Sequence, residues 1–125
     1  MELKEDLYYS KDHEWTKVLN GNARVGITDY AQSQLGDIVY VGLPKVGKEV
    51  KKGKSLCVLE SVKAASNVYA GFDCTVVEVN EKLNDEPELI NKSPYDDGWI
   101  CVVEIKDKEQ IKELISAEEY KKLTE

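Results

Sequence analysis

Short alternations of apolar and polar residues recur along the chain and predict β-strands joined by tight turns. The clearest run is 55–59, Ser-Leu-Cys-Val-Leu, and a shorter strand-like piece, Asn-Val-Tyr, follows at 67–69. Residues 60–66 between them read Glu-Ser-Val-Lys-Ala-Ala-Ser. This pattern predicts a strand, a tight bend and a second strand, with Lys63 near the apex of the bend.

Two parts of the chain resemble each other and predict two similar β-halves. The clearest match pairs Leu-Cys-Val-Leu-Glu at 56–60 with Ile-Cys-Val-Val-Glu at 100–104. Shorter matching pieces precede these strands, at 39–41 in the first half and 77–79 in the second. Two buried strands can also resemble each other by chance. The alternation and the frequent glycines favour a small sandwich or flattened barrel.

Helices are expected only at the periphery of this fold. We expect a short helix from Thr28 or Asp29 to Gln34, stopped by Gly36, and a helical turn at 87–90. Two further short helices are predicted near the C-terminus, where capping-box pairs occur at Asp107 with Gln110 and at Ser116 with Glu119. These two helices are expected to form a clip over one end of the sandwich, and an interaction surface is the alternative.

Length and charge narrow the class of protein. The 125 residues are 42% hydrophobic, which predicts a single domain over residues 1–125. The formal net charge of −7 argues against binding to nucleic acid or to an anionic membrane. A monomer that docks on basic partner surfaces is expected. The sequence has no apolar run of 18 residues and no signal-peptide pattern at its start.

A search for catalytic and metal-binding groups leaves one lysine. Cys57, Cys74 and Cys101 are far apart in sequence, which argues against zinc or a disulfide framework and favours a reducing compartment. His13 is the only histidine, and nucleophile and phosphate-loop motifs are absent from the sequence. No metal site and no independent enzyme activity are therefore expected. From spacing alone, Lys63 is more simply an ordinary surface lysine than a modified one.

A resemblance to a known family changes that interpretation. Residues 60–66 resemble the lipoyl-attachment site of the H proteins of the glycine cleavage system. Further motifs of the family recur in order along nearly the whole chain, at 9–15, 25–32, 35–41, 43–44, 76–80, 89–91, 93–95 and 97–99. Biotin carriers have methionines beside the lysine, and lipoyl domains of 2-oxoacid dehydrogenases usually have Asp before it. Val62 and Ala64 therefore fit both of these families less well than they fit the H proteins.

The resemblance implies a fold, a cofactor and a set of partners. The fold would be a mainly β, lipoyl/biotinyl-type β-sandwich (barrel-sandwich hybrid) of two similar halves. Lipoate would be attached covalently to Lys63, in a site framed by Glu60, Val62 and Ala64. As a non-catalytic shuttle, the chain would carry the aminomethyl group of glycine from a pyridoxal-phosphate glycine decarboxylase to a tetrahydrofolate-dependent aminomethyltransferase. It would also present the dithiol to dihydrolipoyl dehydrogenase, after a lipoyl ligase or transferase had loaded it.

The resemblance also implies a cleft that protects the loaded arm. Asp12, Glu14 and the position of Asn67 would hold the cationic amine, with Glu14 carrying most of the interaction and Asp12 assisting. The family often has an acid where this chain has Asn67, which would weaken the cleft. Cys74 replaces a turn glycine of the family, and we expect a shifted turn in which Gly71 takes the left-handed conformation.

Two other functions remain open from the sequence. The chain could be an H-like lipoyl donor that serves lipoate relay or another complex. It could also be an unmodified interaction module in which Lys63 is only a surface residue. The expected location is the cytoplasm, or the mitochondrial matrix if a transit peptide has been removed.

Overall fold

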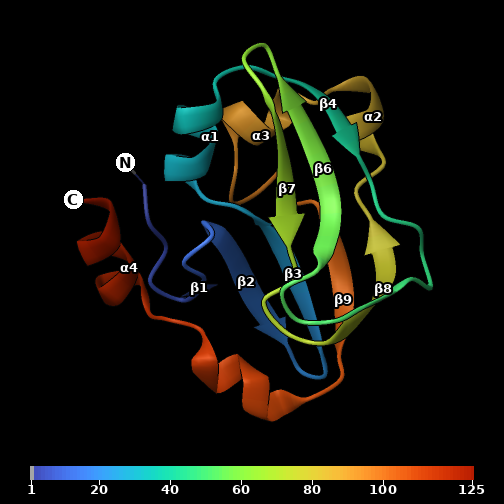
Figure 1. Cartoon of the computed structure of the whole chain (residues 1–125), viewed down its shortest axis with the longest axis vertical. Coiled ribbons are helices and arrows are strands. Elements are labelled where there is room, and N and C mark those ends of the chain that lie inside the picture. Colours follow the sequence, from blue (N-terminus) through green and yellow to red (C-terminus); the bar gives the residue numbers. More distant parts are fainter. Residues whose placement is uncertain (1) are drawn as a thin grey trace.

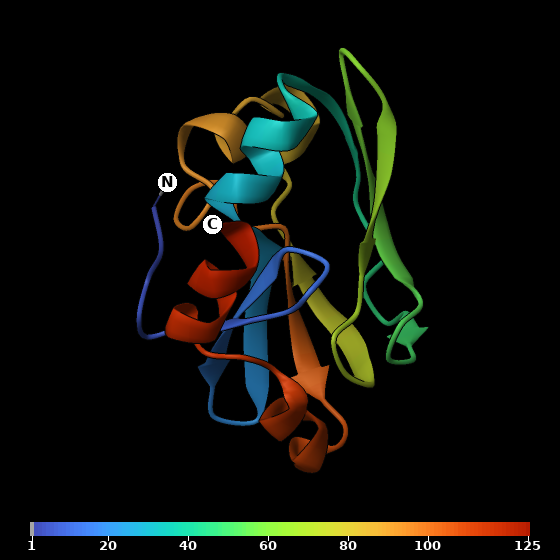
Figure 2. The same ribbon diagram turned by 60° about the vertical axis from the view of Figure 1, so that its left-hand side comes forward.

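The structure, a computed structural model, consists of two β-sheets that face each other. It describes residues 2–125, so Met1 lies outside the described residues. The larger sheet has the strand order β1-β2-β3-β9-β8-β5, and the smaller sheet has the order β4-β6-β7. Figure 1 shows the elements along the chain, and Figure 2 shows the two sheets as separate layers. The predicted mainly β sandwich is confirmed.

The strands are short and the helices lie outside the two sheets (Figure 1). The strands are β1 Tyr8–Tyr9, β2 Glu14–Leu19, β3 Asn22–Ile27, β4 Ile38–Gly42, β5 Glu49–Val50, β6 Ser55–Ser61, β7 Ala65–Tyr69, β8 Cys74–Val79 and β9 Cys101–Ile105. The helices are α1 Asp29–Leu35, α2 Lys82–Asp85, α3 Leu89–Lys92, the 3-10 helix η1 Lys108–Glu113 and α4 Ala117–Thr124.

The main core lies between the sheets and is made of the alternate side chains that the pattern predicted. In β6, Cys57 and Leu59 are buried while Val58 between them faces outward. Leu56 is buried as well, because the register of β6 on β7 shifts between Ser55 and Cys57. Burial of a leucine side chain stabilises the fold by about 1.5–3 kcal/mol. The alternation therefore fixes which face of the β6–β7 hairpin meets the larger sheet.

The sequence repeat corresponds to a structural repeat. β6 pairs with β4 in the smaller sheet, and β9 pairs with β8 in the larger one, in both cases antiparallel. Each pair also has an irregular register, around Val39 in the first and Val77 in the second, which are matching positions of the repeat. Each half therefore contributes one irregular strand pair to one layer of the sandwich.

The peripheral helices follow the predicted capping signals in part. Thr28 caps α1, since its hydroxyl accepts the backbone N–H of Ala31, and Gly36 ends the helix with a φ of 78°. The helical turn predicted at 87–90 is shifted, because the helix there is α3 at Leu89–Lys92, with α2 before it. Among the described helices, none is long and apolar enough to cross a membrane.

The C-terminal segment differs from the predicted pair of α-helices. The first helix, η1, is a 3-10 helix, and Gln110 does not complete a capping box because its side chain accepts the backbone N–H of Asp73. The second, α4, is capped by Ser116 as predicted. Its Tyr120 packs with Tyr9 and Trp15 in a second apolar cluster, separate from the main core. The clip therefore covers β1 and β2 as well as one end of the sandwich (Figure 2).

The turn before β8 also differs from the prediction. Among the described glycines, only Gly36, Gly47 and Gly53 have positive φ, so Gly71 does not take the left-handed conformation. A Cβ on Gly71 would instead lie 3.1 Å from Cδ2 of Leu114, which indicates that close packing favours glycine there. Cys74 is the first residue of β8, is buried, and has no backbone strain to relieve.

Candidate functional site

Lys63 lies at the tip of the hairpin that joins β6 to β7. Lys63 and its neighbours Val62 and Ala64 are all exposed. Figure 2 shows this tip projecting at one end of the smaller sheet. Among the described residues, no ion pair involves Lys63. The amine is therefore open to solvent and to another protein.

The bend is held by Ser61, which the sequence analysis did not single out as a site residue. The Ser61 hydroxyl accepts the backbone N–H groups of Lys63 and Ala64, each at 3.1 Å. The Ser61 N–H donates to the Ala64 carbonyl at 2.8 Å and closes the hairpin. A serine that bonds the backbone two and three residues ahead is a known turn former, and this was the signal that could have found it.

The tip also rests on the segment that follows α1. The Val62 N–H donates to the Asp37 carbonyl at 3.0 Å. A Cβ on Gly36 would lie 3.5 Å from Cε of Lys63, so the aliphatic part of the lysine lies over Gly36. Glu60, the remaining predicted residue of this site, is exposed on β6 opposite Tyr40 and Ala65. The bend that carries Lys63 is thus fixed from both sides while its amine stays exposed.

Glu14 forms a second centre, between the sheets. Its side chain is only 7% exposed. The Ser10 hydroxyl donates to Oε1 at 2.5 Å, and the Tyr69 N–H donates to Oε2 at 3.2 Å. Burial raises the pKa of Glu14 from 4.5 to about 7, against the opposing effect of these two hydrogen bonds. The carboxyl group is therefore poised to change charge near neutral pH.

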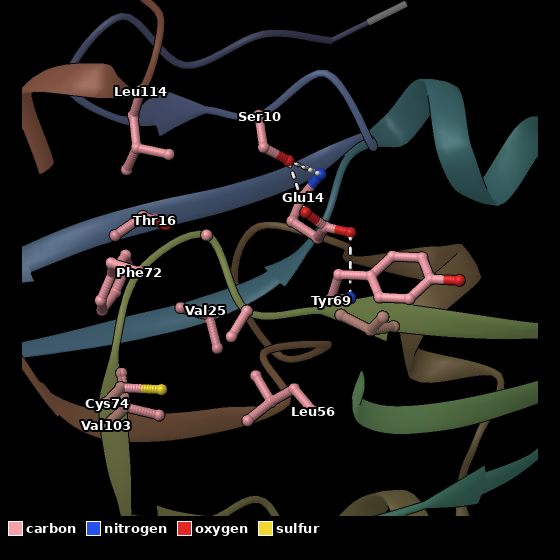
Figure 3. Close-up of a pocket in the computed structure, with 13 residues that line it drawn as sticks. Ser10, Glu14, Thr16, Val25, Leu56, Tyr69, Phe72, Cys74, Val103 and Leu114 are labelled. Atoms are coloured by element: carbon pink, nitrogen blue, oxygen red, sulfur yellow. Dashed lines mark hydrogen bonds between the residues drawn. The ribbon is translucent and has the colours of Figure 1, made fainter. Parts of the chain in front are cut away.

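Two hollows meet at Glu14. One is an apolar cavity with about 10 Å³ of free space, roughly the room that one water molecule needs. Figure 3 shows Glu14 at its polar edge, with Leu56, Phe72 and Cys74 among the other lining residues. The other is a surface groove of about 290 Å³ that Asp12 also lines. Glu14 is thus the acid that the inner cavity and the outer groove share.

The structure brings two of the three predicted cleft residues together. Asp12 and Glu14 line the same groove, although Asp12 is exposed and Glu14 is buried. Asn67 lines neither hollow. Its neighbour Val68 points into the core, so Asn67 lies on the outer face of β7, where it accepts the Ser55 hydroxyl at 2.8 Å. Strand alternation places Asn67 and the groove on different faces.

His13 and the three cysteines lie in surroundings that are typical of structural residues. The His13 ring is half-buried, and its Nδ1 lies 2.8 Å from the Tyr120 hydroxyl. Burial lowers the pKa of His13 and favours the neutral imidazole. Cys57, Cys74 and Cys101 are free and buried, and burial raises the pKa of all three thiols. Within residues 2–125, no group of His, Cys, Asp and Glu could hold a metal ion.

Comparison with known proteins settles the family. A family profile described as glycine cleavage H-protein matches residues 7–125. The chain belongs to the glycine cleavage H-protein family. It is 57% identical over 122 residues to a glycine cleavage system H protein of Coprothermobacter proteolyticus, covering 97% of this chain and 96% of that one. It is 58% identical over 118 residues to an H protein of Aquifex aeolicus, covering 94% and 69%.

A solved structure agrees with this assignment. The crystal structure of a glycine cleavage system H protein from Mycobacterium marinum superposes with a TM-score of 0.89, at 37% sequence identity and 98% coverage of both chains. Membership of the H-protein family makes this chain a lipoyl carrier of the glycine cleavage system. The function and the lipoyl-type sandwich that the ordered motifs predicted are confirmed.

Proposed function

We propose that Lys63 is the residue that takes lipoate, through an amide bond at Nζ, and that the chain itself catalyses no step. The observation that carries this proposal is the exposed, hydrogen-bonded bend at the tip of the β6–β7 hairpin. Ser61 and the Asp37 carbonyl fix the backbone on both sides of Lys63, and the small side chains there leave room for an acylating enzyme. These surroundings suit a long, flexible acyl arm.

The partners follow from the family and from the charge of the chain. When bound, lipoate would supply the dithiol that carries the aminomethyl group of glycine from glycine decarboxylase to the aminomethyltransferase and that dihydrolipoyl dehydrogenase reoxidises. The chain's part is to present the attachment point and to offer docking surfaces. Its net charge of −7 suits partners with basic surfaces. Its buried, unpaired thiols are compatible with the reducing cytoplasm that we propose as its location.

The groove at Glu14 is our candidate for holding the loaded end of the arm. A cationic amine there would form charge-assisted hydrogen bonds with the Glu14 carboxylate, and Asp12 would add to the field from the surface. An amine beside Glu14 would favour its ionised form and lower its pKa from about 7. Asn67 is directed away from this groove, so the geometry supports Asp12 and Glu14 only.

Exchange of the glycine carboxyl carbon tests the proposed role. The lipoylated chain is mixed with glycine decarboxylase and carboxyl-labelled glycine, and labelled carbon dioxide is counted. We expect label release with the native lipoylated chain, and only background release with Lys63→Arg or the unmodified chain. Lys54→Arg, which alters a lysine outside the hairpin tip, should behave as the native chain does. Release of labelled carbon dioxide with Lys63→Arg at the native level would contradict the proposal.

A further inference from the structure

Tyr120 joins three segments that are far apart in sequence. Its side chain is fully buried, and its ring stacks on Tyr9 with centroids 4.8 Å apart. Its hydroxyl lies 2.7 Å from Oγ1 of Thr28 and 2.8 Å from Nδ1 of His13. Whichever way the protons point, this hydroxyl bridges the Thr28 side chain, at the start of α1, and the His13 ring.

His13 has an unusual backbone that needs such support. Its φ is 70°, in the left-handed region that residues with a Cβ rarely adopt, at a cost of about 1–3 kcal/mol. The His13 N–H donates to the Ser10 carbonyl, and the His13 carbonyl accepts the Thr28 N–H, each at 3.1 Å. The ring packs on Tyr30 with centroids 4.8 Å apart. With the Tyr120 bond, these contacts hold His13 through both its backbone and its ring.

Glu14 is the next residue, so the His13 conformation sets the direction in which Glu14 enters β2. The Glu14 N–H donates to Oγ of Ser10 at 3.1 Å, and the same hydroxyl donates back to the Glu14 carboxylate. This reciprocal pair forms only when the Ser10–His13 turn is closed. The closed Ser10–His13 turn keeps the Glu14 carboxylate within hydrogen-bond distance of the Tyr69 N–H on the opposite sheet.

We propose that Tyr120 is a positioning residue: its hydroxyl holds the ring of His13, and thereby keeps the turn closed and the Glu14 carboxyl in the wall between the cavity and the groove. The C-terminal helix α4 would thus act, through His13, on the acid that we propose receives the loaded arm. The use of this arrangement rests on the proposed role of Glu14, while the arrangement itself belongs to the unmodified chain.

The test measures the Glu14 carboxyl by NMR titration of the unmodified chain. We expect Tyr120→Phe to let the turn relax, hydrate Glu14, and lower its pKa toward 4.5 by roughly half a unit or more. Tyr9→Phe is the matched control. It removes the hydroxyl of an equally buried ring in the same cluster, and that hydroxyl bonds the backbone of Lys4 rather than the His13 ring. An unchanged Glu14 pKa in Tyr120→Phe, or an equal shift in Tyr9→Phe, would overturn the proposal.

A double-mutant cycle tests whether the effect passes through His13. Glycine adopts positive φ without strain, so His13→Gly keeps the turn accessible but removes the ring. We expect Tyr120→Phe to shift the Glu14 pKa much less in the His13→Gly background than in the native one. Equal pKa shifts in both backgrounds would overturn the proposal that Tyr120 acts on Glu14 through the His13 ring.

The loaded chain separates this proposal from the proposed function. We expect Glu14→Gln to speed spontaneous release of ammonia and formaldehyde, and Tyr120→Phe to speed it by a smaller factor. Unchanged release from Glu14→Gln would overturn the role of Glu14 in holding the arm. A native release rate from Tyr120→Phe, with Glu14→Gln faster, would overturn the relay alone.

Discussion

The hairpin tip and the Glu14 groove differ in how the chain builds them. The tip is made by its own sequence: Ser61 bonds residues two and three positions ahead, and the nearest outside support, Asp37, follows α1. Glu14 is held by the nearby Ser10 and by Tyr69, 55 residues away, and its neighbour His13 is held by Tyr120, 107 residues away. One centre is local and exposed, and the other is long-range and buried. Changes at the first should therefore act on loading, and changes at the second on the loaded state and on stability.

The largest effect is expected in the pH dependence of stability. Because burial raises the pKa of Glu14 from 4.5 to about 7, the folded chain keeps a proton between these pH values that the unfolded chain has released. Stability is therefore lost as pH rises through this range, by about 3 kcal/mol in total. Glutamine does not titrate. The difference in the free energy of unfolding, Glu14→Gln minus the native chain, should therefore rise by this amount between pH 4.5 and 7.5.

Urea unfolding at a series of pH values measures that difference. A constant offset between Glu14→Gln and the native chain is expected as well, because the glutamine amide cannot reproduce both hydrogen bonds. Only the pH-dependent part reports the buried charge. Glu118→Gln, at an exposed position of α4, is the control and should run parallel to the native chain. A Glu14→Gln curve parallel to the native one would show that Glu14 is solvated.

The next effect concerns the loaded arm. Loss of the Glu14 charge should remove a charge-assisted hydrogen bond worth about 1.5–3 kcal/mol, and so speed release of ammonia and formaldehyde roughly ten- to hundredfold. Release is followed by ammonia assay after the loaded chain is freed from the decarboxylase. Asn67→Ala serves as the control, since Asn67 faces away from the groove, and should leave the rate unchanged. Faster release from Asn67→Ala would place the arm on the other face of β7.

A smaller effect is expected at the tip. Ser61→Ala leaves the N–H groups of Lys63 and Ala64 without their acceptor and loosens the bend, at a cost of about 1 kcal/mol. The initial rate of lipoylation should fall about fivefold, as measured by intact mass over time. Ser61→Thr keeps the hydroxyl and should retain most of the rate. Equal lipoylation rates for the native chain, Ser61→Ala and Ser61→Thr would mean that the bend does not need the hydrogen bonds of the Ser61 hydroxyl.

The smallest effect is expected at Asp12. This carboxylate is exposed, so water and salt screen its field at the groove, and an exposed ion pair is worth about 1 kcal/mol or less. Asp12→Asn should speed release less than Glu14→Gln does, and the difference from the native chain should vanish as salt is raised. A salt-independent effect of Asp12→Asn as large as that of Glu14→Gln would give Asp12 the main role.

The same contrast explains what the sequence could predict. Alternation and local turn signals are short-range, and they predicted β6, the bend at Lys63, the caps of α1 and α4, and the structural repeat. The groove depends on contacts between distant segments. Alternation with the apolar Val68 could have shown that Asn67 faces outward, but nothing local to Tyr120 shows that it reaches His13. The missing capping box of η1 has the same origin, because Gln110 bonds Asp73 rather than its own helix start.

The central claim is that one lysine at a fixed, exposed bend receives the lipoyl group. Intact-protein and peptide mass spectrometry after incubation with lipoyl ligase, ATP and lipoate tests it directly. The account predicts the mass of a single lipoyl group, located on the peptide that contains Lys63 and absent from Lys63→Arg. A lipoyl group on any other lysine, or an unchanged gain in mass with Lys63→Arg, would contradict it.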